Sequence, residues 1–180
     1  MGWSCPPEPT CDTCSGVATS GLQAATNIML DLVHLQPTAW MLWQIVDVRR
    51  WGLVDGDVDK GTLGGILNRH FVLAQFTRHI RRGMEMISGG QPNTVAAYDA
   101  AAHKLVIVSL NSGAAQKFTY DLSRFGRVPA DGAVVRRWST DTGSGDRYRL
   151  RTDTQIAGKR FSAACSTSSI QTFEIDGVHL

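Results

Sequence analysis

From Met84 to the end, the sequence alternates short β-type runs with turn signals, and no other feature restricts the fold as strongly. Eight such runs recur at a spacing of roughly ten residues, among them TVAAYD, KLVIVSLN and IQTFEID. The segments between them carry Gly, Pro, Asn and Asp, as in SGGQPN and DTGSGD. Short, evenly spaced strands of this kind are typical of antiparallel sandwiches. We therefore predict a β-sandwich over residues 84–180, with Trp138 in its core.

The residues before Gly83 follow a different period. Apolar side chains recur at spacings of three and four from Leu22 to Leu35, which predicts an amphipathic helix. Thr19 or Ser20 can cap the start of this helix, and Pro37 ends it.

Three further segments complete this first part. Thr38–Gln44 is short, aromatic and preceded by Pro, and it is predicted to be a buried strand. Residues 47–65 are polar and rich in Gly, which predicts a long loop. The spacing then returns to that of a helix over residues 68–82, and Gly83 follows as the terminating residue.

Composition excludes several classes of protein. The 180 residues include 43% apolar side chains, enough for a substantial core, and the net charge of +2 is spread along the chain. We expect no nucleic-acid partner, because no basic stripe is present. We also expect no membrane span, because no apolar run approaches about 20 residues, and no signal peptide, because the first ten residues lack an apolar core.

The cysteines are unevenly placed, with three close to the start and one close to the end: Cys5, Cys11, Cys14 and Cys165. A surface loop stapled by disulfides is the favoured interpretation, because no fourth ligand lies near the first three. Zinc ligation remains the alternative. Four cysteines allow three complete pairings, and the spacing does not choose among them.

The order of several motifs resembles the C-terminal part of glycoside hydrolase family 30, in particular its endo-β-1,6-galactanase-like branch. These motifs are LQPTAWMLWQ, FVLAQFTRHIRRG, NTVAAYDAAAHKLVIVSLN and SSIQTFEIDGV. The resemblance implies a (β/α)8 barrel fused to a β-sandwich. On this map residues 1–83 are the end of the barrel, with Thr38–Gln44 as its eighth strand, and residues 84–180 are the sandwich.

The family also implies a retaining mechanism with two glutamates, at the ends of the fourth and seventh barrel strands. Both positions are expected upstream of Met1, so we predict no catalytic residue in this chain. Glu8 is a poor substitute, because a lone carboxyl in a Pro-rich loop has neither a partner nor rigid support. The DGDVD motif lacks the spacing of a calcium-binding EF-hand loop, and we expect no metal and no cofactor.

Substrate contacts are expected at the end of the predicted barrel strand. Alternation places Trp40 and Trp43 on opposite faces, and binding at the C-terminal ends of barrel strands favours Trp43. An indole face suits the C–H patches of a sugar, and Gln44 can bind a hydroxyl. Trp3 and Trp51 border the same mouth, where anchoring a loop is the alternative role. We take Trp43, Gln44 and Trp3 as the candidate substrate-binding residues.

The resulting hypothesis is a fragment of an extracellular endo-glycosidase that acts on β-1,6-galactan and is inactive alone. We expect a monomer with a polysaccharide or oligosaccharide substrate. The alternative is a non-catalytic sugar-binding or scaffolding module, in which strand aromatics form a platform; the candidates are Tyr98, Phe118, Tyr120 and Tyr148.

Overall fold

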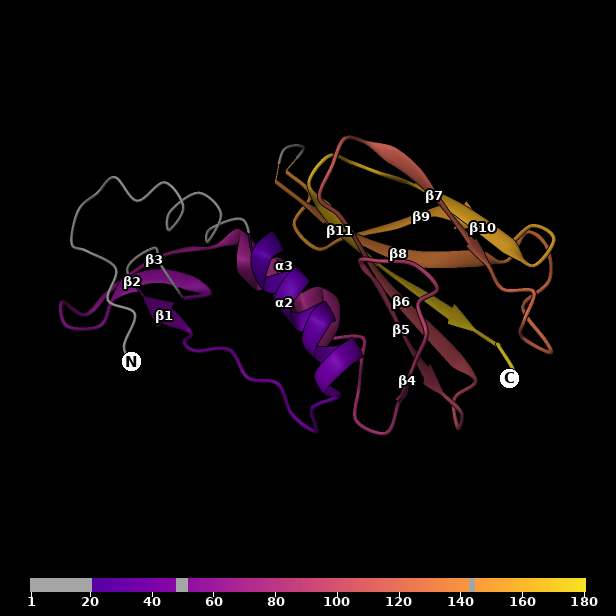
Figure 1. The fold of residues 1–180 in the computed structure, drawn as a ribbon. Helices are drawn as coiled ribbons and strands as arrows, with labels where there is room; N and C mark the ends of the chain where they lie inside the picture. Colours follow the sequence, from indigo (N-terminus) through magenta and orange to yellow (C-terminus); the bar gives the residue numbers. More distant parts are fainter. Residues whose placement is uncertain (1–20, 48–51, 143–144) are drawn as a thin grey trace.

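The computed structural model describes residues 21–47, 52–142 and 145–180 (Figure 1). All eight β-type runs predicted after Gly83 are confirmed as strands. They are β4 (Glu85–Ile87), β5 (Thr94–Asp99), β6 (Lys104–Asn111), β7 (Gln116–Asp121), β8 (Val134–Asp141), β9 (Arg149–Gln155), β10 (Arg160–Cys165) and β11 (Ser169–Asp176).

The strands form two antiparallel sheets of unequal size. Six strands pair in the order β4-β5-β6-β11-β8-β9, and the remaining two form the pair β10-β7. The two-stranded sheet covers one face of the larger sheet, and the helices α2 and α3 cover the other face (Figure 1). The β part is therefore the middle and one outer layer of a three-layer arrangement.

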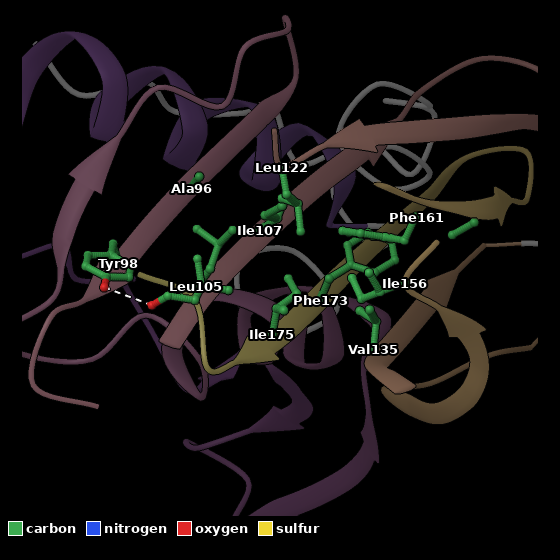
Figure 2. Packing of buried hydrophobic residues seen from close by; sticks show 12 residues of the cluster. Ala96, Tyr98, Leu105, Ile107, Leu122, Val135, Ile156, Phe161, Phe173 and Ile175 are labelled. Atoms are coloured by element: carbon green, nitrogen blue, oxygen red, sulfur yellow. Dashed lines mark hydrogen bonds between the residues drawn. The ribbon is translucent and has the colours of Figure 1, made fainter. Parts of the chain in front are cut away.

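One apolar core fills the space between the two sheets. Phe173 of β11 lies at its centre, and its ring contacts those of Tyr120 and Phe161 at centroid distances of 4.9 and 5.2 Å. Leu105 and Ile107 of β6 point into the same core (Figure 2). The two sheets are thus joined mainly by apolar burial, which favours the packed state in proportion to the area removed from water.

A second core lies between the six-stranded sheet and the helices. Its buried members are Ala25, Ile28, Met29, Val72, Phe76, Val95, Val106, Val108, Leu110 and Ile170. Strand β6 contributes alternate residues to both cores, which explains why its sequence is apolar almost throughout. The helices before Gly83 and the sheet after it share this second core. The division of the chain into two domains at Gly83 stays a prediction.

The first helix begins directly after a glycine. Helix α2 (Leu22–Leu30) is preceded by Gly21 at φ 76°. Thr19 and Ser20, the predicted capping residues, lie outside the described residues, so their role stays a prediction. A side chain at Gly21 would come within 2.6 Å of the backbone of Arg69, so the close approach of the second helix requires glycine. The helix continues as a π-helical turn, η1 (Asp31–Leu35), and ends before Pro37 as predicted.

Helix α3 (Asn68–Thr77) ends five residues before the predicted end, so Arg81 and Arg82 are not in its last turn. The reason is tertiary. His79 is buried against the sheet, where Glu174 and Tyr148 bind its ring nitrogens. Trp138 lies half-buried beside His79 and belongs to neither core, so its predicted place in the core of the sandwich is wrong. Alternation along β8 turns Val135 toward the smaller sheet and Trp138 toward the helices.

Between the two helices, the structure differs from the prediction in both segments. Thr38–Gln44 forms no strand in this structure, whereas the predicted loop contains β2 (Val54–Asp57) and β3 (Thr62–Ile66). These pair as a hairpin beside the two-residue strand β1 (Val46–Asp47). A barrel strand needs hydrogen-bonding neighbours on both sides, and residues 38–44 have none in the described chain. The barrel remnant therefore stays a proposal.

Among the described residues, no helix combines the length and the hydropathy that a transmembrane span requires.

Candidate substrate-contacting surface

The segment between Pro37 and β1 is fixed to the helices through Trp40. Its indole Nε1 donates a hydrogen bond to Asp31 Oδ2 at 2.9 Å, and its ring packs against the core of the helices. Asp31 lies at the point where α2 passes into the π-helical turn. Trp40 therefore belongs to the helical layer and is not available as an open sugar platform.

The opposite side of the same segment is open to solvent. Met41 and Trp43 have exposed fractions of 89% and 79%, and Ile45 continues the same side. The predicted placement of Trp40 and Trp43 on opposite faces is confirmed. The indole of Trp43 is thus free to contact a ligand or another protein surface with its aromatic face.

Trp43 and Gln44 lie between two anchored points. On one side Trp40 is bound to Asp31. On the other side the carbonyl of Ile45 accepts hydrogen bonds from the backbone N–H groups of Leu53 and Val54 at 2.7 and 2.9 Å. Gln44 itself is half-buried. Two fixed ends restrict where the Trp43 ring can move, which is the condition for a preorganised contact.

Exposed apolar side chains concentrate around this segment. Nine of the twelve large apolar residues that are exposed in the described chain fall between residues 30 and 66: Leu30, Val33, Leu35, Met41, Trp43, Ile45, Val58, Leu63 and Ile66. We refer to these nine as the exposed apolar set. Where such residues form one contiguous patch, they mark a surface that binds protein or ligand.

The acidic residues after the segment organise a turn. Asp57 Oδ1 accepts hydrogen bonds from the backbone N–H groups of Asp59 and Lys60, and its Oδ2 lies 2.8 Å from Lys60 Nζ. The hydrogen bond from the Lys60 side chain is the main reason why the pKa of Asp57 is below its usual value. In the described chain, no group of three or more His, Cys, Asp or Glu side chains is placed to hold a metal ion.

Several sequence candidates fall outside the described residues, namely Trp3, Cys5, Glu8, Cys11, Cys14 and Trp51. Their predicted roles stay predictions. The fourth disulfide candidate, Cys165, is corrected, because it is a free thiol buried in β10. Burial raises the pKa of this thiol to about 11, so it is protonated and unreactive near neutral pH.

The proposed aromatic platform on the strands is also corrected. Tyr98 and Tyr120 belong to the core between the sheets, and Tyr98 donates a hydrogen bond to the carbonyl of Val178 at 2.9 Å (Figure 2). Tyr148 lies on the helix side, where it binds His79. Because these rings face different layers, they and Phe118 cannot bind one sugar chain together.

A polar cluster that sequence reasoning missed connects α3 to the sheet. Glu174 Oε1 lies 2.8 Å from His79 Nδ1, and Tyr148 Oη lies 2.7 Å from His79 Nε2. Arg136 binds the other oxygen of Glu174 at 2.9 Å. Burial would raise the pKa of Glu174, but the hydrogen bond with His79 and the nearby positive charges hold it below its usual value. The partners are 69 and 95 residues apart, so no local spacing could have revealed them.

Comparison with known proteins shows which enzyme this sequence is similar to. No family model matches the sequence. Over 161 residues, or 89% of this chain, the sequence is 50% identical to an endo-β-1,6-galactanase from Hypocrea rufa. The resemblance to endo-β-1,6-galactanases is confirmed. The chain spans about a third of that relative, 34% of its length.

Solved structures agree on the fold. A family 30 subfamily 8 xylanase from Clostridium acetobutylicum matches 89% of this chain with a TM-score of 0.66 at 19% identity, over 39% of its own chain. The catalytic domain of the family 30 xylanase C from Talaromyces cellulolyticus matches 89% with a TM-score of 0.67 at 21% identity, over 36% of its chain. The matched regions are the C-terminal parts of those chains. The chain therefore has the fold of the C-terminal part of these family 30 enzymes.

Proposed function

We propose that this chain is the C-terminal part of an extracellular glycosidase that hydrolyses β-1,6-linked galactan. The observation that carries the proposal is the 50% identity with an endo-β-1,6-galactanase across 89% of the chain. In a retaining glycosidase one carboxylate attacks the anomeric carbon while a second protonates the leaving oxygen, and water then releases the sugar. The substrate is thus a polysaccharide or oligosaccharide, and a nucleic-acid partner or oligomer is not expected.

In this proposal the chain supplies one wall of the substrate cleft. Residues 1–83 would complete the barrel, and the exposed apolar set would be covered where the remaining barrel elements pack. Trp43 and Gln44, held between the anchors at Trp40 and Ile45, would contact the sugar, together with Trp3. The exposure of Trp43 supports this arrangement.

We propose further that the chain alone does not hydrolyse galactan. A retaining enzyme needs two carboxyl groups about 5 to 5.5 Å apart on rigid elements. Two acidic side chains on either side of Trp43 along the chain have other partners, because Asp31 binds Trp40 and Asp57 binds Lys60 in a turn. The two family glutamates would belong to the larger part of the enzyme, of which this chain matches 34%.

A hybrid enzyme tests this proposal. The matched third of the Hypocrea rufa galactanase is replaced by this chain, and release of reducing ends from β-1,6-galactan is measured for the hybrid and for the 180-residue chain. We expect the hybrid to hydrolyse galactan and the chain alone to give no release above background. Hydrolysis by the chain alone, or an inactive hybrid that is folded by circular dichroism, contradicts the proposal.

Trp43 has a separate prediction in the hybrid enzyme. Trp43→Ala removes the stacking surface for the sugar, and we expect kcat/KM on β-1,6-galactan to fall about tenfold, which corresponds to about 1.4 kcal/mol. The matched control is Met41→Ala, because Met41 lies on the same side and is even more open to solvent than Trp43. We expect it to change kcat/KM less than twofold. Equal losses from both substitutions would show that Trp43 has no specific contact.

A further inference from the structure

Three arginines each lie over an aromatic ring along the seam between α3 and the hairpin of β8 and β9. The pairs are Arg78 with Tyr148, Arg147 with Phe71 and Arg136 with Trp138, at 5.2, 5.9 and 5.8 Å between the guanidinium carbon and the ring centroid. They are all the cation–π contacts in the described part of the chain. We refer to these six residues as the arginine seam. Its members come from distant segments, so folding gathers charges that the sequence spreads out.

The arginine seam carries positive charge that is only partly compensated. The guanidinium of Arg136 is paired with Glu174 at 2.9 Å and with Asp176 at 2.8 Å. Arg78 and Arg147 are exposed, and neither forms an ion pair with any other residue of 21–47, 52–142 or 145–180. Two cations are therefore open to a negatively charged ligand.

The dipole of α3 explains only part of this charge. Cations are favoured at the C-terminal end of a helix, where the last carbonyl groups are partly negative. This accounts for Arg78 and also for the nearby Arg81, whose guanidinium donates a hydrogen bond to the carbonyl of Thr77. It does not account for Arg147, which lies over Phe71 in the first turn of α3, where the dipole disfavours a cation.

The form of the contacts selects the class of ligand. A guanidinium that lies over a ring is preorganised, and it can bind a carboxylate through two parallel hydrogen bonds. A neutral sugar or a nucleobase stacks on an open ring face instead. In the arginine seam the three rings are half-buried and each has an arginine over it. The seam therefore favours anionic groups over neutral sugars and bases.

The spacing of the cations favours a polymer over a small anion. Phe71 and Arg78 are seven residues apart in the chain. At about 1.5 Å per residue, the positions of Arg147 and Arg78 are therefore separated by roughly 10 Å along α3. One carboxylate cannot bind both guanidinium groups at that separation, whereas a chain with repeated carboxylates can.

We propose that the arginine seam binds a polysaccharide that carries carboxylate groups, with Arg78 and Arg147 each binding one carboxylate. The proposal rests on the proposed function, in which this chain belongs to an extracellular enzyme that acts on polysaccharide. The seam is a second sugar-binding surface, on elements other than the segment that carries Trp43. It would hold the enzyme on acidic polysaccharide while the cleft acts on galactan.

Isothermal titration calorimetry of the hybrid enzyme with polygalacturonate tests the proposal. The double variant Arg78→Gln/Arg147→Gln is expected to raise the dissociation constant roughly tenfold, because two charge-assisted contacts are lost. The control Arg124→Gln/Arg127→Gln removes the same charge from the exposed connection between β7 and β8. It should change the dissociation constant less than about twofold, since charges remote from the ligand are screened. Neither double variant should change hydrolysis of neutral β-1,6-galactan.

An unchanged dissociation constant in Arg78→Gln/Arg147→Gln, or equal losses in the two double variants, would overturn the proposal. Binding by the 180-residue chain but not by the hybrid would also overturn it, because the seam would then be covered by the rest of the enzyme. Single-stranded DNA that binds more tightly than polygalacturonate, through the same arginines, would assign the seam to nucleic acid.

Galactan hydrolysis by the same hybrid separates this inference from the proposed function. An active hybrid that does not bind polygalacturonate refutes the inference and leaves the proposed function standing. A folded but inactive hybrid that binds polygalacturonate through Arg78 and Arg147 refutes the proposed function and leaves the carboxylate-binding surface.

Discussion

Glu174→Ala is expected to lower the free energy of unfolding of the 180-residue chain by about 3 kcal/mol. Removing one member of a largely buried group of ion pairs leaves its former partners without a compensating charge. The side chain of Glu174 is only 11% exposed and binds His79 and Arg136. Its loss leaves a buried imidazole without an acceptor beneath the end of α3. Urea unfolding at neutral pH measures the change.

Asp176→Ala is the matched control for this prediction. Asp176 lies two residues along β11 on the same face. Like Glu174, it forms ion pairs with Arg136 and Lys104, but its side chain is 58% exposed. An exposed ion pair contributes at most about 1 kcal/mol. Equal losses from Glu174→Ala and Asp176→Ala would contradict the role given to burial and to His79.

The pH dependence of the same pair has a defined sign. The pKa of Glu174 is lower in the folded chain than its usual value of 4.5, so its charged form stabilises the fold above that pH. This contribution is lost as the pH falls through the folded pKa. The difference in unfolding free energy between the natural chain and Glu174→Ala should therefore shrink below about pH 4.5. A difference that stays constant down to pH 3 would exclude the charge as its source.

Phe173→Ala is expected to cost about 3 to 5 kcal/mol of unfolding free energy, since it removes a fully buried ring and leaves a cavity. Phe173 is 0% exposed and contacts both Tyr120 and Phe161 of the smaller sheet. Because a two-stranded sheet is marginally stable alone, loss of this contact should affect β7 and β10 most.

Phe118→Ala is the comparison for Phe173→Ala. Phe118 is half-buried at the margin of the same aromatic group, 6.5 Å from Tyr120 between ring centroids. Its loss should cost about 1 kcal/mol, since less apolar surface is uncovered. Urea unfolding followed by circular dichroism compares the two. A loss below about 1 kcal/mol for Phe173→Ala would mean that the sheets do not depend on this core.

The sequence predicted the strands well because their signal is local. In TVAAYD and KLVIVSLN the residue types and the turn residues that bound them favour strands regardless of what packs above or below. The segment around Trp43 was only half predictable. Its alternation placed Trp40 and Trp43 on opposite faces, but its aromatic content suggested a strand that the described chain has no neighbours to complete.

The end of α3 shows the same limit for helices. Residues 78–82 have helical spacing, yet the helix stops at Thr77 because His79 binds Glu174 and Tyr148. At Gly21, the close approach of the Arg69 backbone leaves no room for a side chain, so the residue before α2 must be glycine. In both places a contact between distant segments outweighed a local preference of a few tenths of a kcal/mol per residue.

By itself, the sequence determined the eight strands, the two helices, and the opposite directions of Trp40 and Trp43, because each depends on residues adjacent along the chain. Only the tertiary structure decided which face of β8 and β11 meets the helices, how His79 reaches Glu174, and that β7 pairs with β10 alone among the described strands. These depend on which segments lie side by side in space, and the energy of such contacts is absent from any short window of sequence.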